Sequence, residues 1–468
     1  MNETQLTRVK PSQRQLDWQK KEFYGFIHFG MNTMTDREWG LGNEDPKLFD
    51  PKKLDCEQWV RGMKAAGMTG GILTCKHHDG FCLWPSKFTQ HSVASSPWKD
   101  GKGDVVKEFS EACYKYGLKF GVYLSPWDRT EATYGTGQSY DDFFVGQLEE
   151  LLTNYGSVFE VWFDGANGED ANGKKQKYDW KRYYKIIRKL QPNAVIAVCG
   201  PDVRWVGNEA GVARTNEWSV VPKILQDIEK IAESSQQVDD GKFSRKVSSE
   251  DDDLGSRKVL ANYTGELIWY PAEVNTSIRP GWFYHKNEDE QVRTEDELFD
   301  LYCNSVGGNS TFLLNVPPTP EGLFADQDKT ILAKLGEKIS SLYKDNLIDS
   351  AQINYSSKED KTIFQSSNYS WKPSTTDSHP WISLRWDQPV TVNMIILQEN
   401  ISDSQRIEKC AISAKINDEM EEIISVESVG YKKIIRFEDV RTTEIKIEFL
   451  EFREYPTIEN ISIIDYKI

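Results

Sequence analysis

The feature that most constrains the fold is a regular alternation of short apolar runs and longer amphipathic segments between residues 20 and 340. Repeated strand–helix units with short connections form parallel sheets, because each crossover helix packs back onto the sheet that its strands build. The pattern predicts strands at residues 23–30, 70–75, 118–124, 158–163 and 194–199, separated by helices at 54–66, 104–116, 139–155 and 178–190. Further strand candidates lie at residues 267–270, 282–284 and 311–316. We therefore predict an α/β fold whose sheet closes into a (β/α)8-like, TIM-type barrel.

An open, doubly wound sheet is the alternative arrangement of the same units. Such a sheet carries a glycine-rich phosphate-binding turn after its first strand, and no turn of this kind follows residues 23–30. The periodicity fails between residues 231 and 265, where we expect a polar insertion over the active face of the barrel.

The composition changes after a predicted helix at residues 327–343. Beyond residue 350 the chain shows period-two alternation of apolar and polar residues, with β-rich runs at 381–386, 390–397, 407–416 and 443–449. This alternation is typical of an antiparallel β-sandwich. We therefore predict two domains, a catalytic barrel over residues 1–345 and a sandwich over residues 346–468.

The chain carries 73 acidic and 57 basic residues, which gives a formal net charge of −16. This charge argues against a nucleic-acid partner and against an anionic membrane surface, and favours a neutral substrate. No 18 apolar residues run together, so we predict no membrane insertion. Residues 1–10 lack the apolar core of a leader, so we expect a soluble protein, periplasmic or secreted if a signal peptide was removed and otherwise cytoplasmic. The sequence does not indicate the oligomeric state.

One predicted strand stops abruptly at a carboxylate. The run Val161-Trp162-Phe163 leads directly into Asp164-Gly165, and parallel barrels keep their catalytic residues at the C-terminal ends of their strands. A carboxylate with apolar walls and aromatic neighbours is suited to attack on the anomeric carbon of a sugar. The alternative is that Asp164 only caps the following turn.

Histidines gather at two of the other strand ends. The chain has six histidines, and three of them, His28, His77 and His78, lie at the ends of two predicted strands. Imidazoles suit sugar hydroxyls, because each ring can donate one hydrogen bond and accept another. A metal site is the competing interpretation, but adjacent His77 and His78 would point to opposite faces of an extended chain and no third ligand is evident. The seven scattered cysteines show no zinc-binding spacing either, so we predict no metal and no cofactor.

The segments His28-Phe29-Gly30, His77-His78-Asp79-Gly80-Phe81 and Trp162-Phe163-Asp164-Gly165 occur in this order at strand ends. In this respect the chain resembles the α-L-fucosidases of glycoside hydrolase family 29, over roughly residues 12–340. The resemblance implies a barrel followed by a β-sandwich, and hydrolysis of terminal α-linked L-fucose with retention and without a cofactor. It also implies that Asp164 is the nucleophile. Residues expected to bind the substrate are His28, Glu38, Trp39, His77, His78, Trp84, Trp127, Asp128 and Trp282.

The acid/base residue is harder to assign, because its position varies within that family. The segment Trp205-Val206-Gly207-Asn208-Glu209-Ala210-Gly211 resembles the one that carries it in the branch selective for α-1,3 and α-1,4 linkages. We therefore predict Glu209, with Glu217 and Glu273 as rivals. The substrate implied is a branched, Lewis-type fucosylated oligosaccharide. A broad-specificity fucosidase, a hydrolase for another sugar and a non-catalytic fucose-binding lectin remain alternatives.

Two further assignments stay open. Trp282 could stack on the apolar face of fucose or belong to the barrel core, and Asp128 could meet the leaving group or cap its own loop. The C-terminal runs at 381–384 and 390–397 loosely resemble discoidin-like carbohydrate-binding modules. Whether this domain binds sugar or supports the barrel is not decided by the sequence.

Overall fold

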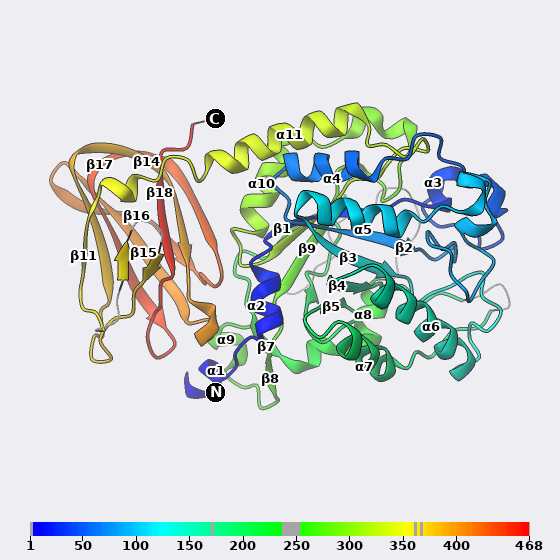
Figure 1. The fold of residues 1–468 in the computed structure, drawn as a ribbon. Coiled ribbons are helices and arrows are strands. Elements are labelled where there is room, and N and C mark those ends of the chain that lie inside the picture. The colour runs from blue at the N-terminus through cyan, green and yellow to red at the C-terminus, as the bar shows by residue number, and fades with distance from the viewer. Residues whose placement is uncertain (1–2, 170–172, 236–252, 360–362, 366–367, 468) are drawn as a thin grey trace.

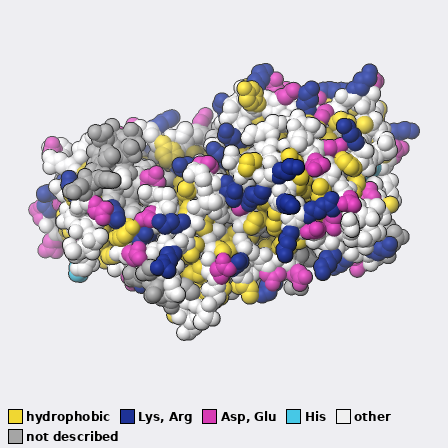
Figure 2. Space-filling model, turned by 60° about the horizontal axis from the view of Figure 1, so that its bottom comes forward, with side chains coloured by type: hydrophobic (Ala, Val, Ile, Leu, Met, Phe, Trp, Pro, Cys, Tyr) yellow, Lys and Arg dark blue, Asp and Glu magenta, His cyan; other side chains and the backbone are white. Residues whose placement is uncertain are grey.

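The computed structural model describes residues 3–169, 173–235, 253–359, 363–365 and 368–467, and it places a barrel and a β-sheet domain side by side (Figure 1). Residues 236–252 of the polar insertion predicted at 231–265 lie outside the described residues. On the face drawn in Figure 2, basic and acidic side chains are interspersed over both domains. Among the described residues, no helix is both long and apolar enough to cross a bilayer.

The barrel is built on one sheet of eight strands, in which every pairing is parallel. In spatial order the strands are β5 (Val195–Val198), β4 (Val158–Phe163), β3 (Lys119–Leu124), β2 (Gly70–Lys76), β1 (Phe23–Ile27), β10 (Thr311–Asn315), β9 (Ala272–Ser277) and β6 (Arg204–Trp205). A single parallel bridge from Ala197 to Val203 spans the gap between the two end strands. The sheet is therefore a nearly closed barrel, as the alternation of strands and helices predicts.

Two of the predicted barrel strands are wrong. Residues 267–270 contain β8 (Leu267–Trp269), which pairs antiparallel with β7 (Val220–Pro222) in a separate two-stranded ribbon. Residues 282–284 form no strand, because backbone N–H groups of this segment donate to a side-chain carboxylate, that of Glu38, instead of to a neighbouring strand. Strands β6 and β9 take the two places in the barrel.

Helices cover the outside of the barrel (Figure 1). They are α4 (Cys56–Ala65), α5 (Val105–Tyr116), α6 (Gln138–Asn154), α7 (Trp180–Leu190), α10 (Glu295–Ser305) and α11 (Asp326–Ser341). Their ends follow from local chemistry. Asp104 caps α5 by accepting from the Lys107 N–H, and Gly117 ends this helix in the left-handed conformation at φ 76°.

Every second residue of a barrel strand points inward, so side chains fill the interior in layers. On β4 the buried series is Glu160 and Trp162, followed by Asp164 just beyond the strand. Going up β4, the side chains therefore change from a sealed acid, through an indole, to an acid at the barrel mouth. The matching inward series on other strands are Tyr24, Phe26 and His28, and Glu273, Asn275 and Ser277.

The C-terminal domain is an antiparallel β-structure, as predicted from the period-two alternation. Its strands are β11 (Gln352–Tyr355), β14 (Trp381–Gln398), β15 (Ile407–Ile416), β16 (Glu419–Glu427), β17 (Lys433–Phe452) and β18 (Asn460–Ile464). Register shifts interrupt the pairing of the two long strands, β14 and β17. The early part of β14 pairs with β11, whereas its late part pairs with β18. Side chains from both parts, including Ile382 and Ile395, share one core.

The C-terminal domain holds the barrel loop that runs from β6 to β7. Lys433 Nζ donates to the Thr215 carbonyl at 2.9 Å, and Asn216 donates to Glu427 at 2.7 Å. The Gln405 side chain accepts from the Ser219 N–H at 2.8 Å. The loop after β6 is therefore fixed at its far end by side chains that lie about 200 residues later in the chain.

Candidate active site

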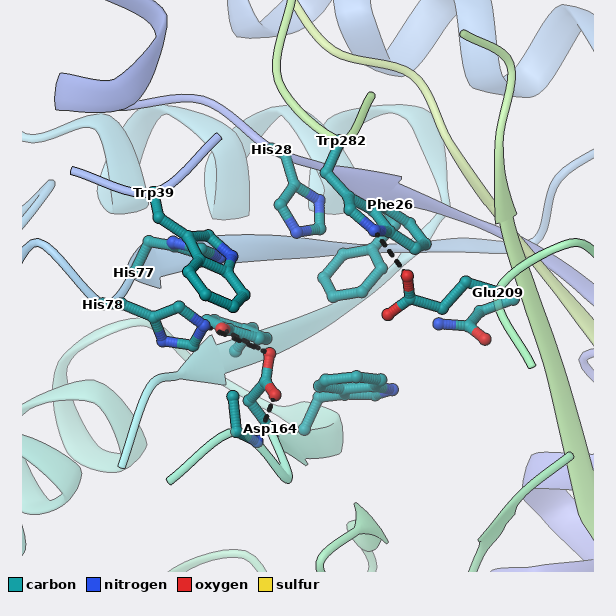
Figure 3. Close-up of a pocket in the computed structure, with 12 residues that line it drawn as sticks. Phe26, His28, Trp39, His77, His78, Asp164, Glu209 and Trp282 are labelled. Atoms are coloured by element: carbon teal, nitrogen blue, oxygen red, sulfur yellow. Dashed lines mark hydrogen bonds and ion pairs between the residues drawn. The ribbon is translucent and has the colours of Figure 1, made fainter. Parts of the chain in front are cut away.

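A cavity of about 470 Å³ opens at the C-terminal ends of the barrel strands (Figure 3). Its walls combine aromatic rings, three imidazoles and two carboxylates. The lining residues are Phe26, His28, Trp39, His77, His78, Tyr123, Trp162, Asp164, Ala166, Glu209, Asn275 and Trp282. Eight of these face one another across the cavity as labelled in Figure 3.

Asp164 lies directly after β4 and is 22% exposed in its side chain. Its Oδ2 accepts from the Tyr123 hydroxyl at 2.9 Å, and its Oδ1 accepts from the Ala166 N–H at 2.8 Å. His78 Nε2 lies 3.9 Å from Oδ2. Burial and the neighbouring Asp164 charge raise the pKa of Tyr123, so the phenol stays protonated and remains a donor. Two fixed donors thus orient a carboxylate that still reaches the cavity.

Glu209 lies on the loop that follows β6, and its Oε2 accepts from the Trp282 indole N–H at 3.2 Å. The two rival carboxylates do not line the cavity. Glu217 is buried between Arg204 and Arg214, with which it forms ion pairs.

Glu273 lies inside the barrel beneath the indole of Trp162. It accepts from the Trp162 N–H at 2.7 Å and from the Tyr24 hydroxyl at 2.5 Å. Trp162 therefore lies between this carboxylate and the cavity that it lines.

His28, His77 and His78 all line the cavity, and the rings of His77 and His78 are 4.1 Å apart between centroids. The expectation that His77 and His78 face opposite ways is wrong, because β2 ends at Lys76 and the chain is no longer extended beyond it. Burial lowers the pKa of His28 to about 3 and that of His78 to about 4, and it lowers the pKa of His77 as well. All three imidazoles are therefore neutral near pH 7 and act through hydrogen bonds.

The same arrangement brings possible metal ligands together. Ligand atoms of His77, His78 and Asp164 lie within 4.8 Å of one another. Two neutral imidazoles and one carboxylate are a donor set that a zinc-like cation accepts. The carboxylate beside the two imidazoles is that of Asp164, at the end of β4.

Several residues expected at the substrate lie behind the cavity wall instead. Both Glu38 oxygens accept backbone N–H groups, from Trp282 at 2.9 Å and from Phe283 at 3.0 Å, and Glu38 also contacts His285 at 2.8 Å. Glu38 therefore holds the segment that carries Trp282. Trp84 is buried, and its indole donates to Glu150 at 2.8 Å.

Asp128 and Trp127 support the loop after β3. Asp128 forms a buried ion pair with Lys76 at 2.7 Å and accepts from the Thr130 and Glu131 N–H groups. Trp127 packs with its ring 4.8 Å from that of His78. The loop-capping alternative for Asp128 thus describes its contacts.

Five lining residues were not among the predicted site residues: Phe26, Tyr123, Trp162, Ala166 and Asn275. Phe26 on β1 lies two positions before His28, and Trp162 on β4 lies two positions before Asp164. The two-residue repeat of strands, applied backwards from His28 and Asp164, is the signal that finds them.

Taken together, a parallel barrel, a cavity at the C-terminal ends of its strands, aromatic walls and two cavity-lining carboxylates from different loops define a glycoside hydrolase. The family model for α-L-fucosidases matches residues 9–341. The chain belongs to the α-L-fucosidase family, glycoside hydrolase family 29. Its enzyme class is therefore that of the α-L-fucosidases.

Individual relatives agree over nearly the whole chain. It is 38% identical over 466 residues to α-L-fucosidase 1 of Arabidopsis thaliana, covering 97% of this chain and 87% of the relative. A crystal structure from Bacteroides ovatus, whose assigned activity is also that of an α-L-fucosidase, is 44% identical with a TM-score of 0.86, covering 99% of this chain and 75% of that one. A Ruminococcus gnavus fucosidase in complex with fucose is 29% identical with a TM-score of 0.84, covering 98% and 95%.

Proposed function

We propose that this α-L-fucosidase is a retaining exo-enzyme that removes terminal α-1,3- or α-1,4-linked L-fucose from branched, Lewis-type glycans. The observation that carries the mechanism is the pair Asp164 and Glu209, two carboxylates on different loops that line one aromatic-walled cavity. The fucose complex of the Ruminococcus gnavus relative supports fucose as the sugar.

In the proposed mechanism Asp164 attacks the anomeric carbon and forms a covalent fucosyl–enzyme intermediate. Tyr123 and the Ala166 N–H hold one oxygen each of this carboxylate, which fixes the direction of attack. Glu209 first protonates the departing glycosidic oxygen and then, as a base, activates the water that releases fucose. For this chemistry the two carboxyl groups are expected about 5–5.5 Å apart when fucose is bound.

The assignment of Glu209 as acid/base is supported by what its rivals do. Glu217 forms buried ion pairs with Arg204 and Arg214 and does not line the cavity. Glu273 is separated from the cavity by Trp162. The Trp282 indole donates to Glu209 and also lines the cavity. A sugar that contacts this ring therefore lies next to the Glu209 carboxyl group.

The linkage preference rests on the segment Trp205–Gly211, which resembles that of the α-1,3/1,4-selective branch. The experiment is to measure fucose release from Lewis a and Lewis x trisaccharides, from an α-1,2-fucosylated glycan and from an aryl fucoside. Release confined to the Lewis sugars supports the proposal as a whole. Release from all four keeps the fucosidase and removes the linkage claim, whereas release from none, with fucosylated glycans still bound, points to a lectin.

A further inference from the structure

The three cavity histidines each use one ring nitrogen, Nδ1, for a contact with a buried polar side chain. The partners are Asn315 for His28, Asn32 for His77 and Ser125 for His78. All three partners are fully buried. Within the described residues no protein group hydrogen-bonds to any of the three Nε2 atoms, so these are the nitrogens left for a ligand. Whether each Nε2 donates or accepts depends on its partner across the ring.

His28 faces an acceptor. The Asn315 amide nitrogen donates to Ser277 Oγ at 2.9 Å and to the Trp282 carbonyl at 2.8 Å, which fixes the orientation of the amide. Its Oδ1 lies 2.9 Å from His28 Nδ1. Since this oxygen can only accept, the His28 proton lies on Nδ1 and its Nε2 offers a lone pair.

His78 also faces an acceptor. The Ser125 hydroxyl donates its single proton to the Trp127 carbonyl at 2.6 Å. Ser125 Oγ, 2.7 Å from His78 Nδ1, is thereby left to accept. His78 Nε2, the nitrogen nearer to Asp164, consequently offers a lone pair as well.

His77 faces a donor. The Asn32 amide nitrogen donates to the Glu38 carbonyl at 2.9 Å, and the same nitrogen lies 3.3 Å from His77 Nδ1. Turning the amide over would bring two oxygens to 2.9 Å, which is repulsive. His77 Nδ1 therefore accepts, and the proton of this neutral ring lies on Nε2.

We propose that Asn32, Ser125 and Asn315 are positioning residues that fix the three histidine tautomers, so that the cavity presents one imidazole N–H donor, His77, flanked by two imidazole acceptors, His28 and His78. A hydroxyl held by the adjacent rings of His77 and His78 then accepts from the first and donates to the second. This part of the inference rests on the proposed function, because it takes a sugar as the ligand. It also makes His77 a poor metal ligand, because its cavity-facing nitrogen carries a proton.

The groups around the rings leave this pattern intact near neutral pH. Titratable neighbours of His77 are His28, at 5.7 Å between ring centroids, His78 at 4.1 Å, Tyr123 at 5.7 Å, and Asp164, whose ligand atom lies within 4.8 Å. Burial keeps the imidazoles neutral, and the two neighbouring histidines further lower the pKa of His77. Each ring thus holds a single proton, whose position is set by the partner at Nδ1.

Neutron diffraction from the deuterium-exchanged, substrate-free protein near pH 8 tests the tautomers directly. We expect deuterium on Nδ1 of His28 and His78, and on Nε2 of His77. Deuterium on Nδ1 of His77, with the Asn32 amide turned over, overturns the inference. This measurement does not depend on the substrate, so its failure is distinct from a failure of the proposed function.

A matched pair of variants tests the role of the tautomers in the reaction. In Asn32→Asp the new carboxylate forces the His77 proton onto Nδ1 and removes the donor at Nε2. We expect kcat/KM for an aryl fucoside, relative to wild type, to fall about ten- to hundredfold at pH 8 and to recover on acidification, as Nε2 regains a proton. In Asn315→Asp the carboxylate still accepts from Nδ1, so the relative kcat/KM is highest at pH 8 and falls on acidification, as His28 loses its acceptor.

Opposite pH trends in these two variants are the result that the inference requires. A purely structural effect of either substitution lowers activity without reversing its pH dependence between the two sites. Parallel trends therefore overturn the inference, even if the neutron map shows the expected protons. Thermal unfolding of both variants and a substrate-free structure of each check that they are folded.

Discussion

The barrel contains two pairs of carboxylates that differ in how deeply they are buried. Only the pair at the barrel mouth can contact a ligand in the cavity. Asp164 and Glu209 line the cavity at the barrel mouth, whereas Glu160 and Glu273 are fully buried below it. Asp164 and Glu160 lie only four positions apart on the same strand. The strand geometry that points both side chains inward thus gives one acid access to a ligand and seals the other beneath Trp162.

The two carboxyl groups of the lower pair, Glu160 and Glu273, share one proton. Burial and the neighbouring Glu273 raise the pKa of Glu160 well above its usual range, and burial raises that of Glu273. Glu160 Oε2 accepts from the Trp18 indole at 2.9 Å, while no donor reaches its buried Oε1. A proton on Oε1 that is donated to Glu273 accounts for this, so the pair carries one charge instead of two.

The largest effect is expected at the barrel mouth. Asp164→Asn keeps the size of the side chain and removes the proposed nucleophile, so kcat/KM for any fucoside should fall on the order of 10⁴-fold or more. Glycan binding, measured by calorimetry, should persist. The control is Glu160→Gln, four positions earlier, which should retain most activity. Comparable losses in both variants would mean that depth does not separate the two pairs.

Glu209→Gln should have the next largest effect, and its size should depend on the leaving group. Loss of a general acid costs about 10²–10⁴-fold on glycans, whose leaving oxygen needs a proton. For an aryl fucoside with an acidic phenol the first step needs little proton donation, so the fucosyl–enzyme should accumulate. A burst in rapid-quench kinetics checks this. Equal losses on both substrates argue that Glu209 only orders the Trp282 indole.

Glu273→Ala should affect folding more than chemistry. It leaves the Trp162 N–H, the Tyr24 hydroxyl and the Glu160 proton without their buried acceptor. Each buried group left unsatisfied costs about 1–3 kcal/mol, so a clear drop in the thermal unfolding midpoint is expected. Glu273→Gln keeps an acceptor oxygen and should lose less. An unchanged midpoint for the alanine variant would mean that water replaces the carboxylate as acceptor, or that these buried hydrogen bonds do not stabilise the fold.

The smallest effect concerns pH. Because the pKa of Glu160 is higher in the folded than in the unfolded state, the folded chain binds more protons, and the free energy of unfolding falls as pH rises above about 4.3 toward the folded pKa. Glu160→Gln mimics the protonated acid at every pH. Its unfolding free energy should match wild type at acid pH and decline less at alkaline pH, as chemical denaturation across pH would report. A decline equal to that of wild type contradicts the shared proton.

The parts of the fold that the sequence predicts are those whose strands are apolar. β1 to β5 are largely buried and read as apolar runs. β9, by contrast, is Ala-Glu-Val-Asn-Thr-Ser, because its inward positions carry Glu273, Asn275 and Ser277 for the polar interior. A strand of this kind has the composition of a loop, and β6 has only two residues, so sequence patterns find neither.

The residues of the candidate site also fall into two groups, those that sequence patterns can place and those that they cannot. Asp164, His28 and His77 follow strands directly, so their chain position determines their place in space. Glu38 and Asp128 also follow strands at a distance, but their contacts depend on Phe283 and Lys76, from distant segments. Such pairings are three-dimensional facts, since an acid on a loop looks the same in sequence whether it meets a sugar or a backbone N–H.

The contacts of Lys433, Glu427 and Gln405 with the loop after β6 bear on how such enzymes can be rebuilt. The C-terminal domain supplies no residue that lines the cavity, but it anchors the loop that carries Glu209. The barrel therefore depends on this domain to hold one of its cavity loops. A chimera keeps the loop of Glu209 in place only if its new domain supplies these three anchors. Recombination within the family should therefore succeed by moving the β6–β7 loop and the C-terminal domain together.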